Sequence, residues 1–250
     1  MNSIGSIAEA HSQAAKIAGF AFLFSKVIVV LANFGISFRL SVPSSAVDTA
    51  RNIMANETLF RTNIACNLIY AVTIVVLLAA LYQILKPVNR TLALVAASCW
   101  VVLAMMWSVS ALSMLGALRL LGNAAYLSVF ETNQLQTLAR LHLSSGYDAY
   151  YIGLPFWGLA STIGSYLLFR SRYIPRALAG VGVVSSVWCV FCAFAFIVVP
   201  HFDAIVNAWA FDMPIFLFEI ALGLWLLFNG LSSTGLAEPK IFAEAKHRHT

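Results

Sequence analysis

Six long apolar runs constrain the fold of this chain more than any other feature of its sequence. Each is long enough to cross the hydrocarbon core of a bilayer, which takes about 20 helical residues. The runs cover residues 17–38, 62–85, 91–118, 147–169, 177–199 and 211–231. Because backbone polar groups in lipid must be paired within the segment, each run is expected to form a helix. The sequence therefore predicts an all-α fold, a polytopic membrane bundle of six transmembrane helices.

The composition excludes an ordinary soluble domain. Of the 250 residues, 61% are hydrophobic and only 10% are charged, whereas soluble domains carry about a quarter charged residues. The net charge of +5 comes from basic residues in short loops beside the apolar runs, which indicates orientation rather than nucleic-acid binding. We expect membrane lipids and no nucleic acid as partners, and the oligomeric state stays open.

The distribution of Lys and Arg predicts which side of the membrane each loop faces. Nine basic residues lie on the side of the termini and of the second and fourth loops: Lys16, Lys86, Arg90, Arg170, Arg172, Arg176, Lys240, Lys246 and Arg248. The other side holds five, Arg39, Arg51, Arg61, Arg119 and Arg140. The more basic side should be cytoplasmic. We therefore expect a multi-pass protein of the cell membrane, with residues 1–16 and 232–250 as cytoplasmic segments around a transmembrane domain at 17–231, and no removable signal peptide.

The four cysteines are expected to be packing residues. Cys66, Cys99, Cys189 and Cys192 all lie in apolar runs, whereas a disulfide framework would place them in polar loops. Cys189 and Cys192 have the spacing of a redox pair, but a thiol in apolar surroundings is inert.

Two short outer amphipathic helices are predicted between the spans. Ser45-x-x-Asp48 and Ser128-x-x-Glu131 both have the pattern of a capping box that opens a helix. Each is followed by a span that ends in a basic, proline-bearing turn. This arrangement suggests an internal repeat of helical hairpins, a common construction in membrane proteins.

Several motifs resemble the bacterial membrane family called domain of unknown function 4386. They are DTARNIMANETLFR at 48–61, LY at 81–82, KPVNRTLAL at 86–94, the stretch from Gly164 to Arg170-Ser171, YIPRAL at 173–178, and Glu219 followed by LWLL at 224–227. The resemblance covers roughly residues 15–231. It implies a bacterial multi-spanning protein and brings no activity, cofactor or catalytic residue.

The densest polar patch lies on the predicted outer helix from Ser45 to Arg61. Helical spacing stacks polar side chains on one face and lets Glu57 pair with Arg61. One interpretation is an amphipathic helix in the headgroup region, with its polar face in water. The other turns this face inward, so that it roofs a cavity in the bundle. The candidate ligand-binding residues here are Asp48, Arg51, Asn52, Asn56, Glu57 and Arg61.

A second outer segment contributes His142 and Asp148 as candidate ligand-binding residues. They could share a proton network, because histidine titrates near neutral pH; the alternative is a hydrogen-bonded structural histidine. No recognised ligand spacing such as HExxH is present, so no metal site is predicted.

Glu219 stands near the centre of the last run, and Lys26 stands near the middle of the first. A charged side chain at this depth costs at least ~2.5 kcal/mol. We therefore predict an intramembrane Lys26–Glu219 pair. The open alternatives for Glu219 are a neutral, hydrogen-bonded structural carboxyl and a protonatable group that lines a cavity. The second alternative makes Glu219 the ninth candidate ligand-binding residue.

These patterns lead to a general functional expectation. We expect an outward-facing polar cavity that binds a small or lipid-like ligand. The alternatives are a membrane-embedded enzyme on a lipid or isoprenoid, a small transporter, and a structural or partner-binding protein. No cofactor is predicted, no catalytic residue is identified, and whether the protein is an enzyme stays open.

Overall fold

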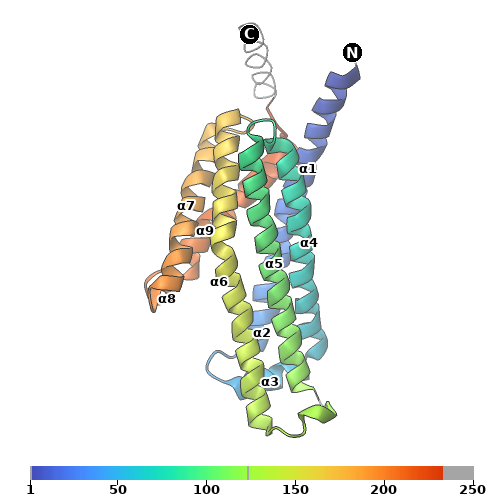
Figure 1. Cartoon of the computed structure of the whole chain (residues 1–250), viewed down its shortest axis with the longest axis vertical. Coiled ribbons are helices and arrows are strands. Elements are labelled where there is room, and N and C mark those ends of the chain that lie inside the picture. Colours follow the sequence, from blue (N-terminus) through green and yellow to red (C-terminus); the bar gives the residue numbers. More distant parts are fainter. Residues whose placement is uncertain (1, 123, 233–250) are drawn as a thin grey trace. The chain divides into compact units, whose positions relative to one another are not determined.

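The computed structural model describes residues 2–122 and 124–232, and these residues form helices and connecting turns without a strand. Six stretches are long and apolar enough to cross a membrane: Glu9–Leu40, Glu57–Leu85, Arg90–Leu121, Thr132–Ser171, Arg176–Val198 and Ala210–Phe228 (Figure 1). The predicted all-α bundle of six spans is confirmed, and the chain is a multi-pass membrane protein. Of the predicted tail at 232–250, only Ser232 lies within the described residues.

The helices follow one another with short connections. In chain order they are α1 (Asn2–Val30), the π-helical η1 (Leu31–Ser37), α2 (Phe38–Leu40), α3 (Ala46–Ala55), α4 (Glu57–Leu85), α5 (Arg90–Leu121), the 3-10 turn η2 (Ala125–Leu127), α6 (Thr132–Ser171), α7 (Arg176–Val198), α8 (Phe202–Ile205) and α9 (Ala208–Phe228). The first span, Glu9–Leu40, comprises α1 from Glu9 onward, followed by η1 and α2 end to end.

The chain divides into two compact units. Unit 1 comprises residues 1–24, 73–102 and 154–250, as far as they are described, and unit 2 comprises 25–72 and 103–153. Unit 1 therefore holds α7, α8, α9 and one end each of α1, α4, α5 and α6. Unit 2 holds η1, α2, α3, η2 and the remaining parts of the helices that both units share.

Close helix contacts hold unit 1 together. A Cβ atom added at Gly19 of α1 would lie 2.7 Å from both Gly223 O and Leu227 N of α9, so these two backbones touch. A Cβ atom at Gly158 of α6 would lie 2.6 Å from a methyl carbon of Val190 on α7. Glycine permits this approach because it has no side chain, as is common between membrane helices.

The core of unit 2 joins the helices around α3. Ile53 of α3 is buried together with side chains of η1, α2, α4 and α5: Ile36, Leu40, Phe60, Ile64, Ala111, Met114 and Leu118. Buried Thr49 fixes the loop before α3, because its hydroxyl accepts from Val42 N at 2.9 Å and donates to Ser45 O at 2.8 Å. The apolar stripe of α3 therefore faces the protein interior.

Both predicted outer helices differ from the structure at their boundaries. The first ends at Ala55, because Asn56 leaves helical geometry with φ −130° and ψ 44°, and Glu57 begins α4. The second is not a separate helix, since α6 runs without a break for 40 residues from Thr132 to Ser171. Nothing between the polar and the apolar part of α6 stops the helix, so one element covers both.

Candidate functional site

A buried polar site of unit 1 is centred on Glu219 of α9. Only 1% of this residue is exposed. Its Oε1 accepts a hydrogen bond of 2.7 Å from the indole Nε1 of Trp157, and a second of 3.3 Å from the hydroxyl of Ser161. Hydrogen bonds to a carboxyl are the usual condition for its burial, since an unpaired polar group in an apolar interior is costly.

The spacing of α6 explains why two of its residues reach the same carboxyl. Trp157 and Ser161 are four positions apart and therefore lie on one face of the helix. Ser165, one further turn along, continues this buried face. A Cβ atom at Gly182 of α7 would lie 2.6 Å from the hydroxyl oxygen of Ser165 and would collide with the ring of Phe218. The helices α6, α7 and α9 therefore pack closely beside Glu219.

A second acid lies on the same face of α9. Asp212 precedes Glu219 by seven residues, or two helical turns, which is about 10.5 Å along the axis. Cys189 of α7 is within electrostatic range of both carboxyls. Sequence reasoning did not single out Asp212; its spacing from Glu219 was the signal that could have identified it.

All four cysteines are buried free thiols. Cys189 and Cys192 are 0% exposed, and they belong to the packed side of α7. This agrees with their predicted role as packing residues.

The six candidates on α3, on α4 and at Asn56 between them are half-buried or exposed, and they pair mainly with residues one helical turn away. Asp48 and Arg51 form an ion pair of 3.3 Å, and their side chains are 49% and 72% exposed. The amide of Asn56 donates to Asn52 O at 3.0 Å. The predicted pair of Glu57 and Arg61 is confirmed, with Arg61 Nη2 at 2.7 Å from Glu57 Oε1.

His142 and Asp148 do not come together. Both side chains are exposed on α6, and the structure contains no hydrogen bond or ion pair between these two described residues. Six positions correspond to about 240° around a helix, so the two side chains lie on different faces. His142 instead lies against α5, where a Cβ atom at Gly116 would be 2.7 Å from its Nδ1. Among the described residues, no group of three or more His, Cys, Asp or Glu residues could hold a metal ion.

Unit 2 contains a buried amide cluster that sequence reasoning missed. The amide of Asn63 donates to the hydroxyl of Ser37 at 2.7 Å, which links α4 to the end of the π-helix η1. The amide of Asn67 donates to Asn63 O at 2.9 Å and also lies 3.8 Å from the sulfur of Met114. Two asparagines four positions apart in an apolar run were the available signal, because they imply a shared polar face.

The predicted pair of Lys26 and Glu219 stays a prediction. Lys26 is 7% exposed and belongs to unit 2, whereas Glu219 belongs to unit 1. The burial of both charges agrees with the premise of the prediction, namely that each needs a partner.

An open depression of about 610 Å³ lies at the start of α6 in unit 2. Its lining consists of Val129, Phe130, Asn133, Gln134, Thr137 and Leu138. None of the nine candidate ligand-binding residues contributes to it.

Comparison with known proteins identifies one family. A family model described as "Domain of unknown function (DUF4386)" matches residues 17–230. No curated protein and no solved structure matches the chain.

Proposed function

The chain belongs to the DUF4386 family, whose description assigns no activity, and we therefore propose a function from the geometry of unit 1: the protein binds a small or lipid-like ligand at an intramembrane polar site. Glu219 is the polar anchor of this site. Asp212, two turns nearer the start of α9, is the acid that a ligand entering from that end would meet before Glu219.

The observation that carries this proposal is the burial of an acid at a position where a residue with a smaller free-energy cost of burial could also join the helices. A carboxyl at bilayer depth costs more than a serine or an amide, even on the lowest insertion scales, which give at least ~2.5 kcal/mol. Helices can be joined by Ser, Thr or Asn at smaller cost. An acid at position 219 therefore indicates a need for charge or for a proton, and intramembrane acids commonly mark substrate or proton pathways.

The chemistry of the carboxyl suggests the class of ligand. A carboxylate accepts hydrogen bonds from hydroxyl, ammonium and indole groups, as Glu219 does from Trp157 and Ser161. A ligand with a hydroxyl or ammonium group and an apolar body would add a donor to the carboxyl and place its body among the apolar side chains. An isoprenoid alcohol or a lipid with a small polar head fits this description.

A structural role for Glu219 is the second candidate. The close packing of α6, α7 and α9 at Gly182 favours it, because a tightly packed interface leaves a ligand little room. In this reading the hydrogen bonds from Trp157 and Ser161 join α6 to α9, and no ligand is involved.

Mass spectrometry of the full chain, purified in mild detergent from its native membrane, separates the two candidates. We expect a stoichiometric small molecule with the wild-type protein and at least about tenfold less of it with Glu219→Gln, since a hydrogen bond to a charged group contributes ~1.5–3 kcal/mol. The matched control is Glu131→Gln, which makes the same change at an exposed residue of unit 2. This control should retain the molecule in full.

Thermal unfolding of the same proteins completes the test. If Glu219→Gln unfolds at the wild-type temperature once both are stripped of small molecules, the lost molecule reports a binding site. If the wild-type protein carries no small molecule and Glu219→Gln lowers its unfolding temperature, the structural role holds and the binding proposal is wrong.

We also infer that both termini face the cytoplasm, from the excess of Lys and Arg on that side. The polar residues of α3, α4 and α6 in unit 2 then face outward. As a separate part of the proposal, we assign them to an outward polar surface: Asp48, Arg51, Asn52, Asn56, Glu57, Arg61, His142 and Asp148.

A further inference from the structure

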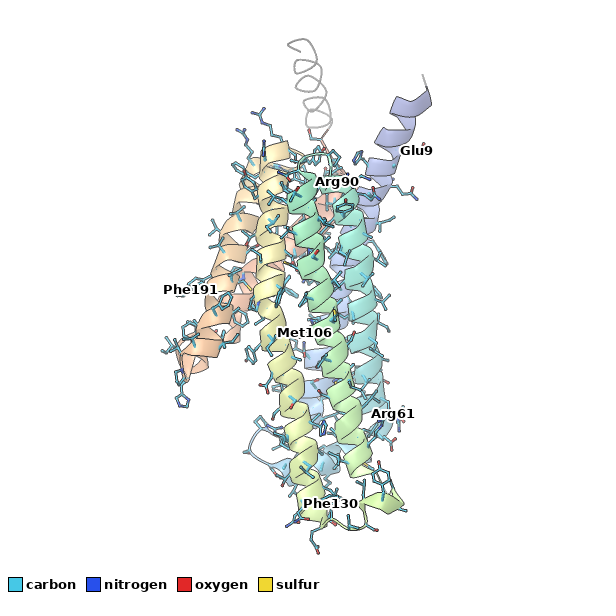
Figure 2. The ribbon with its side chains drawn as sticks, in the orientation of Figure 1. Glu9, Arg61, Arg90, Met106, Phe130 and Phe191 are labelled. Atoms are coloured by element: carbon cyan, nitrogen blue, oxygen red, sulfur yellow. The ribbon has the colours of Figure 1, made fainter. Side chains whose placement is uncertain are left out.

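Two turns at one end of unit 1 carry five exposed basic side chains and no acid. The turn between α4 and α5 contributes Lys86 and Arg90, and the turn between α6 and α7 contributes Arg170, Arg172 and Arg176. Figure 2 shows Arg90 at the same end of the helices as the turn between α6 and α7. These five residues are called the basic face below.

Contacts within unit 1 bring the two turns together. The Cβ position of Gly164 on α6 is 3.9 Å from a methyl carbon of Leu85, the residue that precedes Lys86. The guanidinium of Arg176 lies 5.8 Å from the centroid of the Phe169 ring, so Arg176 reaches back to the end of α6 beside Arg170. The ends of α4 and α6 that lead into the two turns are therefore neighbours, and Arg170 and Arg176 lie close together across the second turn.

Arg172 occupies a backbone conformation that favours glycine. Its φ is 56°, in the left-handed region, directly after the last residue of α6. A glycine at this position after a helix would avoid the steric penalty. The chain instead has an arginine here, which adds a cation to the basic face at the expense of backbone strain.

The surroundings of the basic face match an amphiphile. Tyr166 and Phe169 are exposed apolar side chains of α6 within four residues of Arg170. The start of α7 adds the positive end of a helix dipole, and its N-cap residue, Pro175, provides no side-chain hydrogen bond there. A negatively charged group beside the cations and an acyl chain beside the aromatic rings would satisfy both parts of this surface.

We propose that the basic face binds the phosphate headgroup of an anionic phospholipid. The arginines offer the paired N–H donors that fit phosphate oxygens. Clusters of basic residues at the ends of membrane helices favour anionic headgroups for the same reason. This site is independent of Glu219 and does not require the proposed function to be correct.

Lipid titration of the full chain, followed by native mass spectrometry, tests the proposal. The probes are dioleoyl phosphatidylglycerol and dioleoyl phosphatidylcholine. Removal of two cations in the double variant Arg170→Gln, Arg176→Gln should weaken phosphatidylglycerol binding about 25-fold, since each cation contributes about fivefold. Phosphatidylcholine binding should not change. The matched control is Arg39→Gln with Arg119→Gln, two exposed arginines of unit 2, and it should bind phosphatidylglycerol as the wild-type protein does.

The single variant Arg172→Gly separates lipid binding from folding. Glycine relieves the left-handed conformation, so the unfolding temperature should stay the same or rise while phosphatidylglycerol binding weakens about fivefold. Equal binding of the two lipids by the wild-type protein would overturn the proposal. Equal losses in the double variant and its control would also overturn it, as would full displacement of phosphatidylglycerol by millimolar inorganic phosphate, which would indicate a site for the free anion.

Discussion

Tyr173 stands in the turn between α6 and α7 with 1% of its surface exposed. Its carbonyl oxygen accepts a hydrogen bond from Ser232 N at 3.0 Å, which connects this turn to the segment after α9. Burial raises the pKa of the Tyr173 phenol above its ordinary value, because the charged form would lose its hydration. The stability of this turn should therefore depend on pH in the alkaline range.

The sign of this dependence follows from linkage. Above pH ~10 the unfolded phenol loses its proton, while the folded phenol keeps it until its raised pKa is reached. Alkaline pH therefore favours the unfolded state and lowers the unfolding temperature of the wild-type protein. The variant Tyr173→Phe should show a smaller drop between pH 8 and pH ~10.5, as measured by thermal unfolding in detergent. An equal drop in both proteins would contradict this prediction.

At the residue scale, sequence reasoning succeeds where the partner is local. Ser45 caps α3 as predicted, since its hydroxyl oxygen accepts from Asp48 N at 3.1 Å. The same pattern at Ser128 is wrong, because its hydroxyl donates to Ala125 O and the side chain of Gln134 accepts from Glu131 N instead. The 3-10 turn before α6 causes this difference in capping, and no local sequence motif predicts the turn. The hydrogen-bond donors to Glu219 lie 58 and 62 residues away along the chain. An acid in an apolar run therefore indicates that a partner is needed, but it does not identify the partner.

At the scale of elements, the contact between α1 and α9 depends on the missing side chain of Gly19. A Cβ atom at Gly19 would meet backbone atoms of Gly223 and Leu227 at 2.7 Å, and backbone cannot move aside as a side chain can. We expect Gly19→Ala to force the two helices apart and to lower the unfolding temperature.

Gly180 of α7 provides the matched control for this variant. A Cβ atom there would have no neighbour within 4 Å, and alanine is a better helix former than glycine by ~1 kcal/mol. Gly180→Ala should leave the unfolding temperature unchanged or raise it. If both substitutions changed the unfolding temperature equally, helix propensity and not the α1–α9 contact would explain the change.

A tryptophan of α7 supplies a hydrogen bond that a proline of α9 cannot make. Pro214 has no N–H, so it cannot donate to Ala210 O, the carbonyl four residues earlier. The indole Nε1 of Trp188 on α7 donates to this carbonyl oxygen at 3.1 Å. We expect Trp188→Phe to speed hydrogen exchange in the first turns of α9. Pro214→Ala should largely reverse the effect, because it restores the N–H within the helix, and exchange that stays fast in the double variant would refute this account.

The helices themselves were predictable, and their exact ends were not. Hydrophobic length alone specifies the six spans, because lipid requires it. The break at Asn56 and the π-helical stretch Leu31–Ser37 depend on packing against other helices, which a single sequence does not display. The merging of the second outer helix into α6 had a local signal, the lack of any helix-breaking residue between Thr132 and Tyr147 apart from Gly146.

At the scale of the whole molecule, the inferred orientation can be tested because the native cysteines are buried. An impermeant maleimide should label Ser44→Cys, in the exposed loop before α3, on intact cells. It should label Pro87→Cys, in the exposed turn between α4 and α5, only after the membrane is permeabilised. The reverse pattern would invert the orientation and would place the polar residues of unit 2 in the cytoplasm.

The helix α6 is longer than the hydrocarbon core of a bilayer is thick. Forty residues of helix extend about 60 Å, whereas the hydrocarbon core is about 30 Å thick. About half of α6 must therefore stand among headgroups or in water, and its first half is polar enough to do so, with Thr132, Asn133, Gln134 and Gln136 in its first two turns. The exposed side of this half is an accessible epitope, and an antibody fragment raised against it would bind a helical part of the protein without competing with the detergent belt.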